Sequence, residues 1–434
     1  MTAWTAPYLA SYCFALALAI AIVSRKAFRD LFSPTAVFVF GYGGLYLLGM
    51  LRWALLEEEA QFDDAASFSA VGVVLLGLIS FVAVARTANK AAPAIELGRR
   101  PSTSAGGATL VFIVYGLVSI LAFLALIVLA GGPVEYVLNY EERRLEVLTG
   151  WALVLPLCLP AGNIGFVIWM ADRLQRGAFS VATALMLGLP LAVMNAAFSR
   201  TSLAVLVLTT LVVWHYLWRP IRFRALAVIA SGMLLLLSSI ALYRIATSAP
   251  EVLSNDSSID TLTLLFLGQF DAFDSLVQLI SLDDQWRLQW GATIVLPLLT
   301  KPIPRIVWPD KPLATSHWLM DLLMPGWQDT GLNRAAGLLV EQYVNFSLVG
   351  VVLGMIILAW LWSRFYSNLY KSPTPISAVL LYSQHVTYLV LLIRNDANSI
   401  LPQYLVSIML THVALAMAGA SRTQKIIQRR FSWR

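Results

Sequence analysis

The chain has 434 residues, of which 59% are hydrophobic and 12% are charged, and its formal net charge is +6. Soluble globular proteins carry about 25% charged residues, so this composition excludes that class. Many apolar runs of roughly 18–23 residues are long enough to cross ~30 Å of hydrocarbon. The sequence therefore predicts an all-α polytopic membrane protein.

Apolar runs predict eleven transmembrane helices in chain order. We place them at about 8–23, 34–51, 68–85, 108–130, 151–170, 178–198, 202–218, 225–243, 339–362, 376–393 and 400–419. The first run lacks a basic start, so we interpret it as a span and not as a cleavable signal peptide. Cys13 and Cys158 fall inside predicted spans without metal-ligand or disulfide spacing, and we expect them to pack as small apolar residues.

The basic residues predict the orientation, because short loops rich in Lys and Arg stay cytoplasmic. Of the 30 basic residues, 19 lie in segments that alternate with the spans and so share one side. Those segments are 24–30, 86–107, 171–177, 215–224, 363–375 and the tail after 420. This pattern places the N-terminus outside and the C-terminus in the cytoplasm. The sequence shows no convincing internal repeat, which disfavours an inverted-repeat transporter.

We expect one transmembrane domain over 1–434, with a single large outer loop at 244–338. Residues 261–282 read as an amphipathic helix that carries Asp271 and Asp274 on one face. Residues 291–307 are too apolar for a solvated loop and too rich in proline for a span. Irregular backbone at membrane depth needs protein cover or a wet cavity. The loop is therefore predicted to fold over the outer mouth of the bundle and roof a cavity.

Cations at the outer face are few, and several stand at the ends of spans. The segment IPRIVWPDKP (303–312) holds Arg305 and Lys311 in a proline-rich frame that restricts the backbone. Arginine suits bidentate capture of phosphate oxygens, so a phosphorylated, lipid-borne ligand is a natural inference. Snorkelling to lipid headgroups is the alternative for any one of them. Further candidates among the outer-face cations are Arg143, Arg144, Arg200, Arg244 and Arg394, the last followed closely by Asp396.

Glu341 is the most notable acid, because it stands among apolar residues at the outer edge of a span. An acid there is expensive unless it is paired, and it is a candidate general base. A structural ion pair with Arg334 is the alternative. His317 and Asp321 lie one turn apart in the outer loop and are further catalytic candidates. Asp283 and Asp284 have no additional ligands arranged beside them, so we predict no metal site.

Four segments resemble the Wzy-type polymerases, which join O-antigen and exopolysaccharide repeat units. WGATIVLPLLTKPIPRIVWPDKP (290–312) and VEQYVNFSLVGVVLG (340–354) are similar to that family's loop and following helix, and the second segment includes Tyr343. FSRTSLAVLVL (198–208) looks like the family's serine-arginine helix start, and RND (394–396) resembles its late arginine. Val340 and Ser347 depart from the pattern, which has glycine at both positions.

This resemblance implies a lipid-diphosphate-dependent glycosyltransferase of GT-C-like fold, working at the periplasmic face of the bacterial inner membrane. The donor and the acceptor would both be undecaprenyl-diphosphate-linked oligosaccharides, with no cofactor. Partners would include a flippase and a chain-length regulator, and no nucleic acid. The diphosphate would bind Arg200, Arg305 and Arg394, assisted by Lys311 and Arg244. Glu341 is the preferred base, with His317 or Asp321 as the alternatives.

Other functions remain open at the level of sequence. An O-antigen ligase would share the architecture but move the chain to a different acceptor, and the Glu-x-Tyr-x-Asn-Phe pattern at 341–346 favours a polymerase. A peptidoglycan polymerase would have a loop pattern that is not found here. A lipid-linked-sugar flippase would carry ionisable residues along a path through the membrane. The predicted span centres are nearly free of charge, with the charges at the outer ends.

Overall fold

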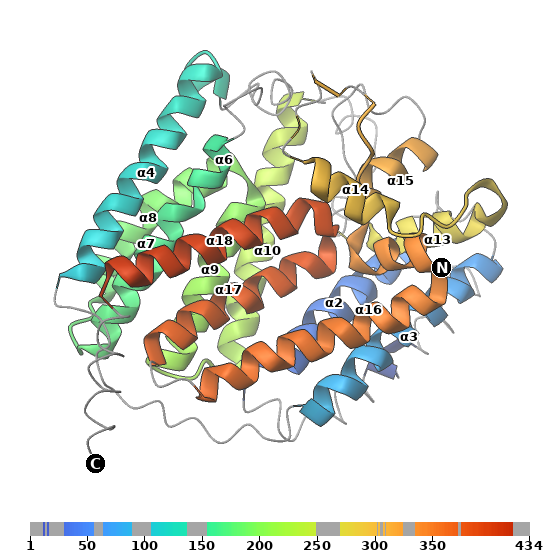
Figure 1. The fold of residues 1–434 in the computed structure, drawn as a ribbon, viewed down its shortest axis with the longest axis horizontal. Helices are drawn as coiled ribbons and strands as arrows, with labels where there is room; N and C mark the ends of the chain where they lie inside the picture. Colours follow the sequence, from blue (N-terminus) through green and yellow to red (C-terminus); the bar gives the residue numbers. More distant parts are fainter. Residues whose placement is uncertain are drawn as a thin grey trace. The chain divides into compact units, whose positions relative to one another are not determined.

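The structure is a computed structural model that describes residues 12–13, 15–16, 30–55, 64–88, 106–136, 154–248, 270–301, 303, 307–308, 310–323, 335–371 and 375–419. Within these ranges all regular secondary structure is helical, and seven helices are long and apolar enough to cross a membrane (Figure 1). The all-α membrane protein predicted from composition is confirmed at this level.

Ten of the eleven predicted spans correspond to apolar helices, but these helices differ in length. Seven correspond to the long apolar helices, and those predicted at 178–198, 202–218 and 225–243 correspond to shorter apolar stretches, Val181–Ala197, Thr201–Leu217 and Phe223–Leu236. The span predicted at 8–23 falls almost wholly outside the described residues. The number of spans and their orientation stay predictions.

The chain divides into two compact units that interleave along the sequence. Unit 1 comprises 1–90, 222–363 and 389–400, and unit 2 comprises 91–221, 364–388 and 401–434. Three long helices, α16 (Gly337–Lys371), α17 (Pro375–Arg394) and α18 (Ala397–Met417), each contribute residues to both units. The single transmembrane domain over 1–434 stays a prediction, since the chain divides into these two units.

Unit 1 is built on the packing of α2 (Pro34–Leu55) against α3 (Asp64–Ala88). Phe38 of α2 stacks on Phe81 of α3, with ring centroids 3.6 Å apart. The amphipathic helix predicted at 261–282 is represented by α13 (Ala272–Ser281), which packs on both. A Cβ at Gly49 would lie 2.8 Å from Phe270 O, so a glycine is needed where α13 meets α2. Unit 1 also contains α10 (Phe223–Ser248), η4 (Asp283–Gln285), α14 (Ala292–Thr300) and α15 (Thr315–Leu323).

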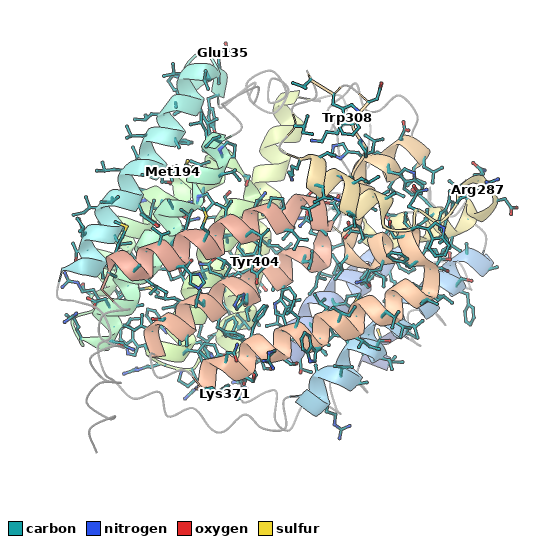
Figure 2. The ribbon with its side chains drawn as sticks, in the orientation of Figure 1. Glu135, Met194, Arg287, Trp308, Lys371 and Tyr404 are labelled. Atoms are coloured by element: carbon teal, nitrogen blue, oxygen red, sulfur yellow. The ribbon has the colours of Figure 1, made fainter. Side chains whose placement is uncertain are left out.

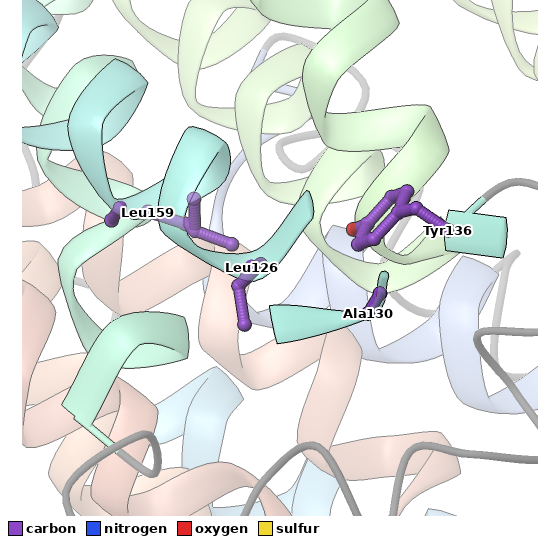
Figure 3. Packing of buried hydrophobic residues seen from close by; sticks show 5 residues of the cluster. Leu126, Ala130, Tyr136 and Leu159 are labelled. Atoms are coloured by element: carbon purple, nitrogen blue, oxygen red, sulfur yellow. The ribbon is translucent and has the colours of Figure 1, made fainter. Parts of the chain in front are cut away.

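Unit 2 contains α4 (Gly107–Leu129), α6 (Leu155–Cys158), α7 (Pro160–Gln175), α8 (Val181–Phe198) and α9 (Arg200–Leu217). Small residues bring α4 and α7 together, since a Cβ at Gly162 would lie only 2.9 Å from the Ser119 side chain. Ser119 donates a 2.8 Å hydrogen bond to Leu159 O beside this contact. Figure 3 shows part of the adjoining apolar cluster, which is formed by Ala122, Leu126, Ala130, Tyr136 and Leu159.

Helix α16 is broken, and this break positions the site described below. Its 35 residues would extend about 52 Å if straight, more than the ~30 Å of hydrocarbon. Phe346 (φ −142°, ψ 17°) and Ser347 (φ 53°, ψ −148°) interrupt it. The first segment, 337–345, folds back so that Gln342 lies against Gly350 and Gly354, where an added Cβ would fall within 2.5 Å of Gln342 atoms. Gly350 and Gly354 therefore allow the first segment of α16 to pack closely against the second segment.

Candidate functional site

A buried network of polar side chains lies where α14, α15, the first segment of α16 and the start of α18 meet. All four of these segments belong to unit 1. We call this network the polar core and define it by Thr293, Thr315, Ser316, Glu341, Asn345, Asp396 and Asn398. Each of these residues is at most 4% exposed. Buried polar groups are costly unless they are hydrogen-bonded, so the partners decide what the network does.

The two carboxylate oxygens of Glu341 accept hydrogen bonds from two different helices, α15 and α18. The Thr315 hydroxyl of α15 donates to Oε1 at 3.1 Å, and the Ala397 amide donates to Oε2 at 2.9 Å. Ala397 is the first residue of α18, so the carboxylate lies at that helix's positive end, where negative charge is favoured. Glu341 is 1% exposed. In this geometry it joins α15, α16 and α18.

Asp396 stands one residue before α18 and, like Glu341, accepts hydrogen bonds from two helices with its two carboxylate oxygens. Its Oδ1 accepts from Ser399 N at 2.8 Å, which is the bond expected of a helix N-cap. Its Oδ2 accepts from Ser316 N at 3.1 Å, near the start of α15. The N-terminal ends of two helices therefore point at a pair of carboxylates. The chain's own acids fill the two anion-binding positions that these helix ends create.

Asn345 and Thr293 attach α14 to the broken end of α16. The Asn345 amide donates to Thr293 Oγ1 at 2.8 Å and to Glu341 O at 2.7 Å, and Gly291 N donates to Asn345 Oδ1 at 2.9 Å. Helix ends leave carbonyls without intrahelical partners. Here Gln289 N donates to Val344 O and Trp290 N to Asn345 O, at 3.1 and 3.0 Å. The start of α14 therefore caps the first segment of α16.

Two lysines stand beside the polar core. Lys301 follows α14, and its ammonium reaches inward to donate to Asn398 O at 2.5 Å, although the residue as a whole is exposed. Enclosure of the ammonium lowers the pKa of Lys301, an effect that Asp396 partly opposes. Lys311 donates to Lys301 O at 3.2 Å and to Ile303 O at 3.1 Å. In this structure Lys311 therefore binds the backbone just after α14.

The other predicted site residues are spread over several environments. Arg394 is half-buried and close enough to Asp271 to interact electrostatically with it, while Asp274 is fully buried. His317 and Asp321 lie exposed on α15, on the side away from Thr315 and Ser316. Tyr343 is half-buried, with its ring centroid 6.0 Å from that of Trp286, which also contacts Trp318. The polar core thus includes two predicted residues, Glu341 and Asp396.

Six predicted residues cannot be placed in full. Arg143, Arg144, Arg305 and Arg334 lie outside the described residues, and only the backbone is described for Arg200, which begins α9, and for Arg244 in α10. Arg200 also belongs to unit 2, whereas the polar core belongs to unit 1. The convergence of the predicted diphosphate-binding arginines therefore stays a prediction.

Sequence reasoning missed much of the polar core. Thr293, Thr315, Asn345 and Asn398 are uncharged residues that carry no signal of their own. Asn345 stands one turn after Glu341, so this spacing could have indicated a polar stripe on one helix face. Lys301 follows a short apolar run and precedes a proline, a pattern that marks a charge at a helix end.

Comparison of this chain with protein-family models, with curated protein sequences and with solved structures gives no match in any of the three.

Proposed function

We propose that this protein is a Wzy-type polysaccharide polymerase that joins undecaprenyl-diphosphate-linked oligosaccharides at the periplasmic face of the bacterial inner membrane. The observation that carries the proposal is the position of Glu341, buried at the meeting of α14, α15 and the start of α18. The motif at 290–312 includes α14, the motif at 340–354 lies in α16 with Glu341 itself, and the motif at 394–396 immediately precedes α18. A GT-C-like fold, an outer N-terminus and an inner C-terminus belong to the same proposal.

Glu341 is our preferred general base, and its hydrogen bonds suggest how a substrate would reach it. Oε1 accepts from the Thr315 hydroxyl at 3.1 Å, which is the distance a base needs to a hydroxyl that it deprotonates. We propose that the acceptor sugar's hydroxyl replaces Thr315 at this oxygen. As the hydroxyl oxygen forms a bond to the donor's anomeric carbon, its proton passes to Glu341. The anomeric carbon–oxygen bond to the diphosphate breaks at the same time.

The leaving lipid diphosphate needs cations, because negative charge develops on it as the bond breaks. We assign this role to Arg200, Arg305 and Arg394, assisted by Arg244 and Lys311, and we add Lys301. Lys301 is supported by its contact with Asn398 and by its electrostatic coupling to Asp396 and Lys311. No nucleotide sugar is required, since cleavage of the glycosyl–diphosphate bond drives transfer.

The decisive experiment incubates the purified protein with lipid-linked repeat units and separates the products by length. A ladder of products is expected from a polymerase. A single transfer to another lipid acceptor would indicate a ligase, and no new bond in a folded preparation would end the enzyme proposal.

Variants then test the site within the same assay. Glu341→Gln keeps the size of the side chain but cannot take a proton, so the ladder should disappear. Thr315→Val removes the hydroxyl beside Glu341 and should weaken the ladder much less. Arg287→Ala, at an exposed cation in unit 1, is the matched control and should leave the ladder intact. A full ladder from Glu341→Gln would refute Glu341 as the base while leaving the polymerase proposal in place.

A further inference from the structure

Helix α14 presents an apolar face that no described part of the chain covers. Val295, Leu296 and Leu299 project from it, and Leu299 is 71% exposed. The opposite face carries Thr293 and Pro297, which are buried. We call this surface the α14 face and include the exposed residues around it: Trp290, Ile303, Val307 and Trp308, the last labelled in Figure 2. Outside a bilayer, a large exposed apolar patch marks a site of interaction with a protein or a membrane.

The α14 face continues onto a transmembrane helix. The Trp290 ring lies against Phe346 at the break of α16, with centroids 6.3 Å apart. Beyond the break, an exposed apolar stripe runs along α16 at helical spacing through Val349, Leu353 and Ile357. An exposed apolar stripe on a spanning helix faces lipid. The surface of α14 is therefore an extension of the lipid-facing surface of α16.

Length and attachment fix where α14 can lie. Its nine residues extend about 14 Å, so it cannot cross ~30 Å of hydrocarbon. The bonds from Gln289, Trp290 and Gly291 to the end of the first α16 segment hold it at the break. The second segment, 348–371, would extend about 36 Å from that point, enough to span the hydrocarbon. The α14 helix is thus held at one border of the bilayer.

The composition of the rim distinguishes lipid from a protein partner. Trp290 is 74% exposed and Trp308 is 40% exposed, and tryptophan is enriched at membrane–water interfaces. Lys301 and Lys311 lie at the C-terminal end of α14, but their ammonium groups bind Asn398 O and the carbonyls of Lys301 and Ile303, so the two tryptophans carry the distinction. We propose that the α14 face inserts into one leaflet of the bilayer. This insertion would set the depth of Lys301 and of the polar core relative to the lipid phosphates.

Site-specific quenching of a fluorophore tests the insertion in the full-length protein. Cys13 and Cys158 are changed to alanine, and single cysteines are placed at Leu299 and Val307 on the α14 face, at Val349 as the lipid reference and at Arg287 as the water reference. Each variant is labelled with an environment-sensitive dye and reconstituted into nanodiscs, in which both membrane faces are open to solution. Quenching is measured with aqueous iodide and with phosphatidylcholine that carries a doxyl group near the top of its acyl chain.

The expected result is that labels at Leu299 and Val307 are quenched strongly by the doxyl lipid and weakly by iodide, as at Val349. The label at Arg287 should show the reverse. Iodide quenching at both α14 positions equal to that at Arg287 would overturn the proposal, because the face would then lie in water. Protection of both positions from both quenchers would also overturn it, since protein and not lipid would cover the face. Two independent positions guard against a local effect of one substitution.

Discussion

The polar core of unit 1 and the α4–α7 contact of unit 2 solve the same packing problem by different means. Lipid is as apolar as the helices, so helix association in a membrane depends on close van der Waals packing and on interhelical hydrogen bonds. The α4–α7 contact depends on close approach at a glycine, Gly162 against Ser119. Unit 1 joins α14, α15, α16 and α18 through the buried side chains around Glu341 and Asp396.

The difference determines which changes each region should tolerate. A glycine contact depends on volume, so it responds to any added atom and is indifferent to charge. A hydrogen-bonded network depends on donors and acceptors, so it responds to changes that preserve volume. Connected polar networks rigidify a structure where their members are satisfied, and in the polar core Asn398 Oδ1 is a buried atom without a hydrogen-bond partner. The polar core is therefore the part of the chain where a conservative change should have the greatest effect.

The largest effect is expected from Glu341→Ala. It removes the acceptor for Ala397 N and for the Thr315 hydroxyl, and a buried donor without a partner costs about 1–3 kcal/mol. Thr315 can turn to Thr293 Oγ1, 3.0 Å away, so most of the loss should come from Ala397. We expect a clear fall in the free energy of unfolding, measured by titration with a denaturing detergent. Wild-type stability would show that the network contributes little.

Gly350→Ala should come next, because the added Cβ would lie 2.5 Å from Gln342 O, a backbone atom that cannot turn away. Overpacking of this kind costs roughly 1–3 kcal/mol. Gly162→Ala, whose added Cβ would lie 2.9 Å from the Ser119 side chain, is a milder overlap and should cost less. Gly72 in α3 and Gly116 in α4 have nothing within 4 Å of an added Cβ. Alanine at these two control positions should stabilise the helix by about 0.5–1 kcal/mol. Equal losses at all four positions would contradict this volume argument.

Much of the helical framework could be predicted from the sequence, because a long apolar run has few alternatives in a bilayer. The run 107–129 illustrates this, since it was expected at 108–130 and forms α4. The break in α16 could not be predicted in the same way. Residues 339–362 read as one apolar span, and nothing in their hydrophobicity separates Phe346 and Ser347 from their neighbours. The break follows from contacts with Gln289 and Trp290, which lie more than fifty residues earlier.

The candidate site was predicted where charge indicated it and missed where neutral polar residues form it. Glu341 is predicted because an acid among apolar residues needs an explanation, and Asp396 because it follows Arg394 in a short outer link. Thr293 and Thr315 were missed because a hydroxyl in an apolar run is common and often bonds its own helix, as Thr209 does with Val205 O. The expected glycine at Ser347 was informative, because the structure shows a backbone conformation there that favours glycine.

Ser347→Gly should therefore stabilise the protein. With φ at 53° and ψ at −148°, this serine occupies a region that residues with a Cβ rarely adopt, and such conformations cost about 1–3 kcal/mol. Glycine removes that strain at the cost of greater freedom in the unfolded chain, so a gain near 1 kcal/mol is expected. Detergent unfolding measures it. Ser367→Gly, further along the same helix, is the control and should destabilise. Loss of stability at both positions would mean that the break is not strained.

The smallest change in stability is expected in unit 2, at the buried amide pair Asn163 and Asn195. Each side chain donates to the other, at 3.0 and 2.8 Å, and Asn195 also donates to Leu191 O. Alanine at either position therefore removes more than the pair, so a double-mutant cycle is needed to isolate the coupling. Such pairs in membrane proteins average about 0.6 kcal/mol, because the unfolded chain in the membrane also finds partners. We expect a value of that size from detergent unfolding.

A coupling above about 1.7 kcal/mol, the upper end for such pairs, would show that unit 2 also depends on its polar contacts. The distinction between the two regions would then rest on the number of hydrogen bonds and not on their kind.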